Sequence, residues 1–189
     1  TRYVDIHRPD GKPDILQQIE HGALNLVAQV KNIGHPVRGI IVPNLHQYNH
    51  LGDASTITDN LPYTPALKPY ETDGKSSGTM DDRWAFTNRM PFLDLQTAAA
   101  LAASYRALKD FNPSLADDCL ACAKKLWEES KDSKMPHMEG IPSFRFPSMD
   151  TEAALQLYIS TKDPQYAKRF ESSLWSSLSS APGFAMSYA

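Results

Sequence analysis

The stretch 110–127, DFNPSLADDCLACAKKLW, returns in altered form at 160–175, STKDPQYAKRFESSLW. Both copies begin with a capping residue and a proline, continue with an apolar residue and Ala, and end in Leu-Trp. A side-chain cap followed by a first-turn proline is a common helix start. Each copy follows an Ala-rich stretch after a short turn, so the unit is a helical hairpin that recurs after about fifty residues.

Helix signals extend to the rest of the chain outside one long loop. The predicted helices cover 13–34, 93–111, 112–130, 151–163 and 164–179. The first starts at a proline, ends at a glycine and carries an apolar stripe. Tetratricopeptide repeats recur at about 34 residues, which fits poorly. We therefore expect an all-α fold, a partial (α/α)6 toroid built of helical hairpins that form inner and outer rings.

A long polar and aromatic segment, 35–94, separates the first two helices. Loops of this length are usually functional or disordered, and the many aromatic residues argue against disorder. Flat rings can cover sugar faces while Asp, Asn, Arg and His bind hydroxyls. The tyrosines Tyr48, Tyr63 and Tyr70 suit either sugar binding or packing of the loop, whereas Trp84 favours sugar binding. The only strand-like run is 38–43.

Composition limits the classes of partner. The chain has 189 residues, 41% hydrophobic and 22% charged, which suits a globular segment with a sizeable core. A net charge of -3 and a pI near 6.0 give no reason to expect nucleic acid or an anionic membrane as partner. No apolar run approaches the roughly 20 residues that span a bilayer. The start lacks Met and a signal-peptide core, so we expect an excised or processed segment.

Neither a metal nor a cofactor is expected. Cys119 and Cys122 fall at helical spacing among apolar residues, so they are interpreted as buried thiols rather than half of a zinc site. His46, His50 and Asp53 lie among Asn and Gly without the glutamate of an HExxH motif, which favours loop hydrogen bonding or ligand contact. The sequence contains no Gly-rich phosphate loop.

Acidic residues are candidate catalytic groups. Glycoside hydrolysis needs two carboxyl groups flanking the scissile bond. Asp81 and Asp82 are adjacent in sequence, and neighbours rarely reach that separation. We interpret them as solvated or substrate-binding acids, and Glu20 as surface charge on the first helix.

Three segments resemble, in order and spacing, the family 9 glycoside hydrolases. The segment 97–130, with its TAAALA core and cap-proline turn, resembles the helix pair of that family. DGKPDILQQIEHGALNLVAQ at 10–29 is similar to its PDILDE-type helix, and AALQLYISTKDPQYAKRF at 153–170 resembles its A-x-x-LY hairpin. The resemblance implies that 1–189 is a single segment of an (α/α)6 catalytic domain, incomplete at both ends.

The resemblance also implies an activity: hydrolysis of a cellulose-type β-glucan with inversion. In the family, an Asp of a DAGD-type motif activates water and a distant Glu protonates the leaving oxygen. This sequence contains no DAGD, so no catalytic residue is assigned and both carboxylates are expected outside the segment. The family's adjacent Asp-Glu calcium pair is not reproduced by Asp150 and Glu152. For the parent protein, an extracellular or periplasmic location is implied.

Substrate-binding residues are carried over from the family's loop before the TAAALA helix, which contributes an acidic-His-aromatic cluster to the sugar cleft. The matching run gives Asp82, Arg83 and Trp84, followed by Arg89. Arg83 stands near the usual His, and Trp84 is the expected stacking platform. The full predicted set, for an oligo- or polysaccharide substrate, is Trp84, Arg83, Asp82, Arg89, Tyr48 and His50.

Two alternatives stay open at this point. Another (α/α)-toroid polysaccharide hydrolase or lyase would place its chemistry on His46, His50, Tyr48 or Arg83. A non-catalytic helical-repeat interaction module would bind no sugar. An incomplete toroid exposes apolar helix faces, so self-association through them is also expected.

Overall fold

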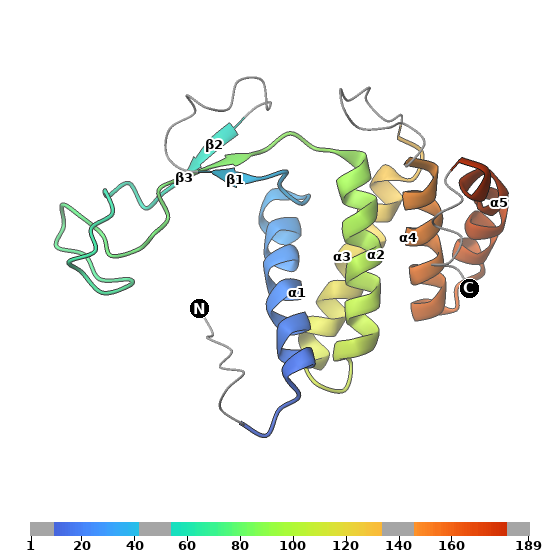
Figure 1. The fold of residues 1–189 in the computed structure, drawn as a ribbon, viewed down its shortest axis with the longest axis horizontal. Coiled ribbons are helices and arrows are strands. Elements are labelled where there is room, and N and C mark those ends of the chain that lie inside the picture. The colour runs from blue at the N-terminus through green and yellow to red at the C-terminus, as the bar shows by residue number, and fades with distance from the viewer. Residues whose placement is uncertain (1–9, 42–53, 134–145, 181–189) are drawn as a thin grey trace. The chain divides into compact units, whose positions relative to one another are not determined.

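The computed structural model describes residues 10–41, 54–133 and 146–180, which form five helices and three short strands (Figure 1). They divide into two compact units. The helical unit comprises Thr1–Pro36 with Met90–Ala189, and the sheet unit comprises Val37–Arg89. Each unit is described separately below.

In the helical unit, α2 (Pro91–Leu108) packs against three other helices: α1 (Asp14–Ile33), α3 (Pro113–Ser130) and α4 (Phe146–Thr161). In turn, α4 packs against α5 (Pro164–Ser180). The largest fully buried side chains of the helices include Leu95, Leu101, Leu108, Leu126 and Leu157. Pairs α2–α3 and α4–α5 are successive hairpins, and α2 and α4 pack side by side. The predicted all-α, partial-toroid architecture is confirmed.

The caps that the sequence predicts are present. The Asn112 side chain accepts a hydrogen bond from the Leu115 amide at 3.2 Å, and Pro113 is the first residue of α3. In the second copy, Asp163 Oδ1 accepts from the Gln165 amide at 3.0 Å, ahead of α5. Both hairpins therefore start their second helix by the same device, which explains the repeat in the sequence.

Other sequence-based boundaries need correction. α4 begins at Phe146 rather than at 151, because a proline in the first turn, here Pro147, does not interrupt a helix. α2 likewise begins at Pro91 and ends before 111. The interpretation of Glu20 as surface charge was wrong: only 7% of it is exposed, and its carboxylate accepts a 2.7 Å hydrogen bond from Asn112 Nδ2.

Small side chains bring α2 and α4 close together. Ser160 Oγ on α4 donates to the Ala102 carbonyl on α2 at 2.8 Å. Arg106 crosses the same contact and donates from Nη1 to the Gln156 carbonyl at 3.0 Å. Burial lowers the pKa of Arg106 from its ordinary value, although Glu152 opposes the shift. The fully buried Ala98 and Ala102 place small side chains of α2 in the packed core, where Ser160 and Arg106 reach backbone carbonyls of the facing helix.

The two cysteines are free and buried in α3, as predicted. Burial raises the pKa of the Cys119 thiol to about 11, and it also raises the pKa of Cys122. Since the thiolate is the reactive form, we expect iodoacetamide to label neither cysteine in the folded protein and both in urea. Mass spectrometry of the alkylated protein checks this. Native labelling at the rate of the unfolded chain would contradict the buried placement.

The sheet unit contains a three-stranded antiparallel sheet of order β1-β3-β2. Its strands are β1 (Ile40–Ile41), β2 (Ala54–Ile57) and β3 (Arg83–Phe86). The first lies in the predicted strand-like run, but the prediction that no other strand occurs was wrong. The two missed strands are four residues long, too short for an alternating pattern to stand out.

Among the described helices, not one combines the length and the apolar character needed to cross a bilayer.

Candidate functional site

Strand β3 organises the predicted substrate-binding residues that the structure describes. Arg83 and Trp84 lie within β3, Asp82 immediately precedes it, and Arg89 follows it with an exposed side chain. The other two predicted residues, Tyr48 and His50, lie outside the described residues, as do His46 and Asp53. The described part of the candidate site therefore consists of β3 and the segment that leads into it.

The strand separates this run onto two faces, because successive residues of a strand point to opposite sides. Trp84 pairs with Ile41 on one side and Thr56 on the other, so it lies on the central strand. Continuing the register places Asp82 opposite Thr58, on the face that carries Trp84. Arg83 lies on the opposite face. The sheet thus places Asp82 and Trp84 on one face of the strand, while Arg83 starts on the other face and its Nη1 donates to the Asp82 carbonyl at 3.1 Å.

Asp82 closes the long loop of the sheet unit at its base. One carboxylate oxygen, Oδ1, accepts a hydrogen bond from Thr58 Oγ1 at 2.8 Å, and Oδ2 accepts from the Tyr63 amide at 2.9 Å. Thr58 and Tyr63 lower the pKa of Asp82 from its ordinary value. A carboxylate oxygen can accept more than one hydrogen bond, so Asp82 has acceptor capacity left for a sugar hydroxyl. That contact stays a prediction.

This depressed pKa sets a pH dependence. Because the folded pKa of Asp82 lies below the unfolded value, its stabilisation is present above the ordinary Asp pKa and is lost as pH falls through the folded pKa. We expect protection of the Tyr63 amide from hydrogen exchange to fall below about pH 4, and Asp82→Asn to flatten that dependence. Asp73→Asn is the matched control, since Asp73 also has a lowered pKa but does not contact Tyr63. An unchanged pH response in Asp82→Asn would contradict this role.

The segment 58–82 is held by its own backbone. The Ser77 amide donates to the Pro62 carbonyl at 3.0 Å, and the Thr64 amide donates to the Ser77 carbonyl at 2.8 Å. At the tip, Asp73 Oδ1 accepts from the amides of Lys75 and Ser76 at 2.8 and 2.6 Å. These bonds give the loop a defined conformation without regular secondary structure.

A neighbouring carboxylate presents an unused acceptor. Asp81 Oδ1 is buried and has no hydrogen-bond partner within the described part of the chain. A buried oxygen in this state is costly, and a donor from a bound molecule or water would satisfy it.

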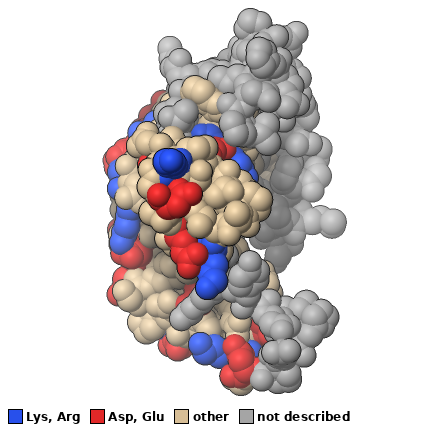
Figure 2. Space-filling model, turned by 90° about the vertical axis from the view of Figure 1, so that its left-hand side faces the viewer, with Lys and Arg blue, Asp and Glu red and all other residues tan. Residues whose placement is uncertain are grey.

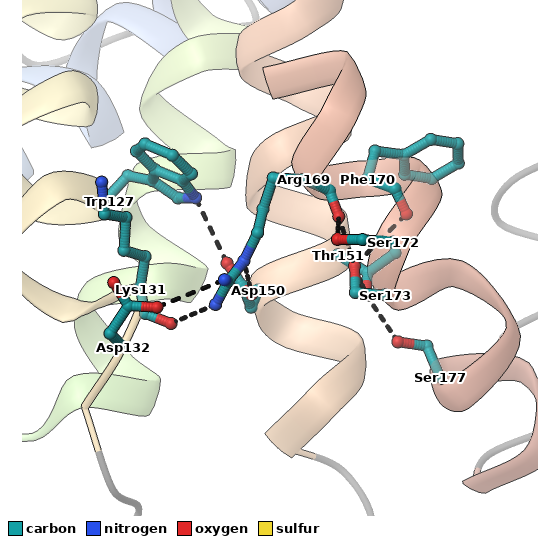
Figure 3. A network of polar contacts seen from close by, with 10 residues as sticks. All are labelled: Trp127, Lys131, Asp132, Asp150, Thr151, Arg169, Phe170, Ser172, Ser173 and Ser177. Atoms are coloured by element: carbon teal, nitrogen blue, oxygen red, sulfur yellow. Dashed lines mark hydrogen bonds and ion pairs between the residues drawn. The ribbon is translucent and has the colours of Figure 1, made fainter. Parts of the chain in front are cut away.

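A second polar cluster lies in the helical unit, and sequence reasoning missed it (Figure 3). Asp150 on α4 accepts a hydrogen bond from Trp127 Nε1 at 3.2 Å and from Arg169 Nε at 2.6 Å. Arg169 also pairs with Asp132 at 3.2 Å, past the end of α3. Burial raises the pKa of Asp150, although Arg169 opposes the shift. The cluster joins α3, α4 and α5, and only the Leu-Trp pair in the repeat hinted at it.

Hydroxyl groups extend the same contact between α4 and α5. Thr151 Oγ1 lies 2.8 Å from Ser173 Oγ and 2.5 Å from Ser177 Oγ, and Figure 3 shows all three pointing toward one another. Thr151 and Ser177 are buried. Because each polar atom is satisfied by a neighbour, this cluster is best explained as a packing contact.

Surface charge and possible metal ligands are two further features of the described residues. On the face drawn in Figure 2, Lys and Arg are interspersed with Asp and Glu rather than gathered by sign. Among the residues that the structure describes, no group of three or more His, Cys, Asp or Glu side chains is arranged to hold a metal ion.

Comparison with known proteins identifies the family. The model of glycosyl hydrolase family 9 matches residues 50–188, a range that includes β3 and the helices from α2 to α5. The chain belongs to glycosyl hydrolase family 9. This confirms the predicted resemblance to the family, and the match includes two of the three segments that carried it, 97–130 and 153–170. A search of curated protein sequences finds no match.

One solved structure of a cellulase shares the fold of this chain. Cellulase Cel9M of C. cellulolyticum in complex with cellobiose is 18% identical, with a TM-score of 0.51 over 85% of this chain and 33% of that one. Another structure of Cel9M is 24% identical, with a TM-score of 0.42 over 50% of this chain and 24% of that one. The chain therefore spans at most about a third of the cellulase that it matches.

Proposed function

We propose that the protein carrying this chain hydrolyses a cellulose-type β-glucan with inversion of the anomeric centre. In this proposal the helical unit is scaffold, and the sheet unit supplies part of the cleft wall. The observation that carries the proposal is the family match, which covers both β3 and the helical hairpins. Binding of cellobiose by a family member of similar fold supports a glucan as the substrate.

The arrangement around β3 supports the role in binding. Trp84 is half-buried, and its backbone lies on the central strand, which pairs with a strand on either side. Asp82 lies on the same face of the strand register as Trp84. An apolar ring beside a carboxylate complements a sugar, which has apolar C–H faces and a rim of hydroxyl donors.

Two of the described carboxylates, Asp82 and Asp150, are poorly suited to donate the proton that glycoside cleavage needs. A general acid works best with a raised pKa. Asp82 has a lowered one, because Thr58 and Tyr63 hold its charged form. Asp150 has a raised pKa, but Arg169 and Trp127 occupy both of its oxygens between helices. Because the sequence contains no DAGD motif, the proposal assigns the acid and the base to parts of the protein outside residues 1–189.

Product analysis on the full-length protein tests the proposal. We expect release of reducing sugar from carboxymethylcellulose, and proton NMR of the first product formed from cello-oligosaccharides should show the α-anomer. Initial formation of the β-anomer would rule out inversion, and an unsaturated uronide from another polysaccharide would indicate a lyase instead. The 189-residue chain alone is expected to release no sugar.

A further inference from the structure

An exposed tyrosine occupies an unusual position in the sheet unit. Lys68, Pro69, Tyr70 and Glu71 form a tight turn, in which the Glu71 amide donates to the Lys68 carbonyl at 3.0 Å. Tyr70 is its third residue and has a φ of 69°. A turn with proline second and a positive φ third normally carries glycine there, because a Cβ atom makes this conformation unfavourable. The positive φ of this position favours glycine, so the backbone conformation does not explain why a tyrosine is present.

Hydrogen bonds and a close backbone contact at Gly78 fix the conformation of this turn. The Gly78 amide donates to the Glu71 carbonyl at 2.9 Å, and Glu71 Oε2 accepts from the Lys68 amide at 3.2 Å. A Cβ atom placed on Gly78 would lie 2.0 Å from the Lys68 carbonyl oxygen, so the turn rests directly on the Gly78 backbone. Proline fixes the remaining flexible position. The Tyr70 side chain is therefore presented from a preorganised base.

The ring itself is left in water. Tyr70 is 75% exposed, the same exposed fraction as Trp175 and the highest among the large hydrophobic side chains that the structure describes as exposed. An aromatic ring held outward on a rigid turn loses little conformational entropy when it binds a ligand. Its electron-rich face attracts the C–H bonds of an apolar surface, and its hydroxyl can bond to a polar rim. The axial C–H bonds and equatorial hydroxyls of a β-glucose ring match both features.

We propose that Tyr70 is an aromatic platform for a glucose ring of the β-glucan chain, in addition to the position assigned to Trp84. This inference rests on the proposed function, since it takes the glucan as the ligand. Binding of a glucose ring would account for an aromatic side chain at a position where the backbone conformation favours glycine. The platform would add binding for a longer oligosaccharide and leave the chemical step unchanged.

The decisive variant is Tyr70→Gly in the full-length protein, because it removes the ring and relieves the backbone strain. We expect its affinity for cellohexaose, measured by calorimetry, to fall about tenfold while its melting temperature stays equal or rises. Tyr70→Phe keeps the ring and should bind within about twofold of the wild type. Met80→Ala is the control, since Met80 is 63% exposed in the same unit and has no assigned role.

Each other outcome has a definite meaning. Unchanged cellohexaose affinity in Tyr70→Gly overturns the inference. A lower melting temperature in Tyr70→Gly also overturns it, because the ring would then be packing against another part of the protein. If the wild type neither binds nor hydrolyses β-glucan, the proposed function itself fails. If the wild type hydrolyses β-glucan and Tyr70→Gly binds equally well, only the platform is wrong.

Discussion

Trp127→Ala is expected to lower the free energy of unfolding by about 3–5 kcal/mol, a large part of the stability of an ordinary domain. Only 3% of Trp127 is exposed, and its ring packs edge-to-face on Tyr166 with centroids 4.8 Å apart. The substitution leaves a cavity at the junction of α3, α4 and α5. It also removes the indole N–H that Asp150 accepts, so a carboxylate with little exposure loses a donor.

The sequence provides its own control for this prediction. Trp175 closes the second copy of the repeat as Trp127 closes the first, yet it is 75% exposed. We expect Trp175→Ala to change the free energy of unfolding by less than about 0.5 kcal/mol. Urea denaturation of both variants, followed by circular dichroism, checks the pair. Equal destabilisation would mean that Trp175 is packed against a further element.

Trp84→Ala is expected to have the largest effect on activity. Removing the ring from the centre of β3 should raise KM for a soluble β-glucan by roughly ten- to a hundredfold, because a stacked indole buries a large apolar area against a sugar. The turnover number should change far less, since no carboxylate involved in bond cleavage is assigned to this strand. Steady-state kinetics on the full-length enzyme measure both constants.

The geometry of β3 supplies the matched comparison. Arg83 is next in sequence but lies on the opposite face, so a single ligand surface cannot use both side chains through the strand. We expect Arg83→Ala to leave KM within about twofold if Trp84 faces the glucan, and Trp84→Phe to recover most of the affinity. A large KM effect for Arg83→Ala with none for Trp84→Ala would place the glucan on the other face.

The helical part of the fold could be predicted because its signals are local. A cap, a proline and an apolar period all lie within a few residues of Asn112 and of Asp163. The predicted start at 151 was wrong for α4, which begins at Phe146, because a proline such as Pro147 is tolerated in the first turn of a helix. The buried Glu20 could not be foreseen, since its partner Asn112 is distant in sequence.

The site was predictable only as a set of residue types. The sequence placed Asp82, Arg83 and Trp84 together, but their division between two faces depends on strands too short to recognise. The base of the loop depends on a bond from Thr58 to a carboxylate 24 residues away. The left-handed conformation of Tyr70 was equally hidden, because glycine is the usual sequence signal for it.

The closure at Asp82 has a consequence for how this part of the protein can vary. Since Thr58 and Tyr63 are joined to Asp82, the two ends of the segment 58–82 are fastened to each other by the sheet unit itself. The tip of the segment, around Gly74, lies outside this attachment, so a change in its length leaves the bonds of Asp82 to Thr58 and Tyr63 in place. Substitutions at the tip around Gly74 should therefore disturb this segment less than substitutions at Gly78, which supports the turn at Lys68, or at Asp82, which joins the two ends.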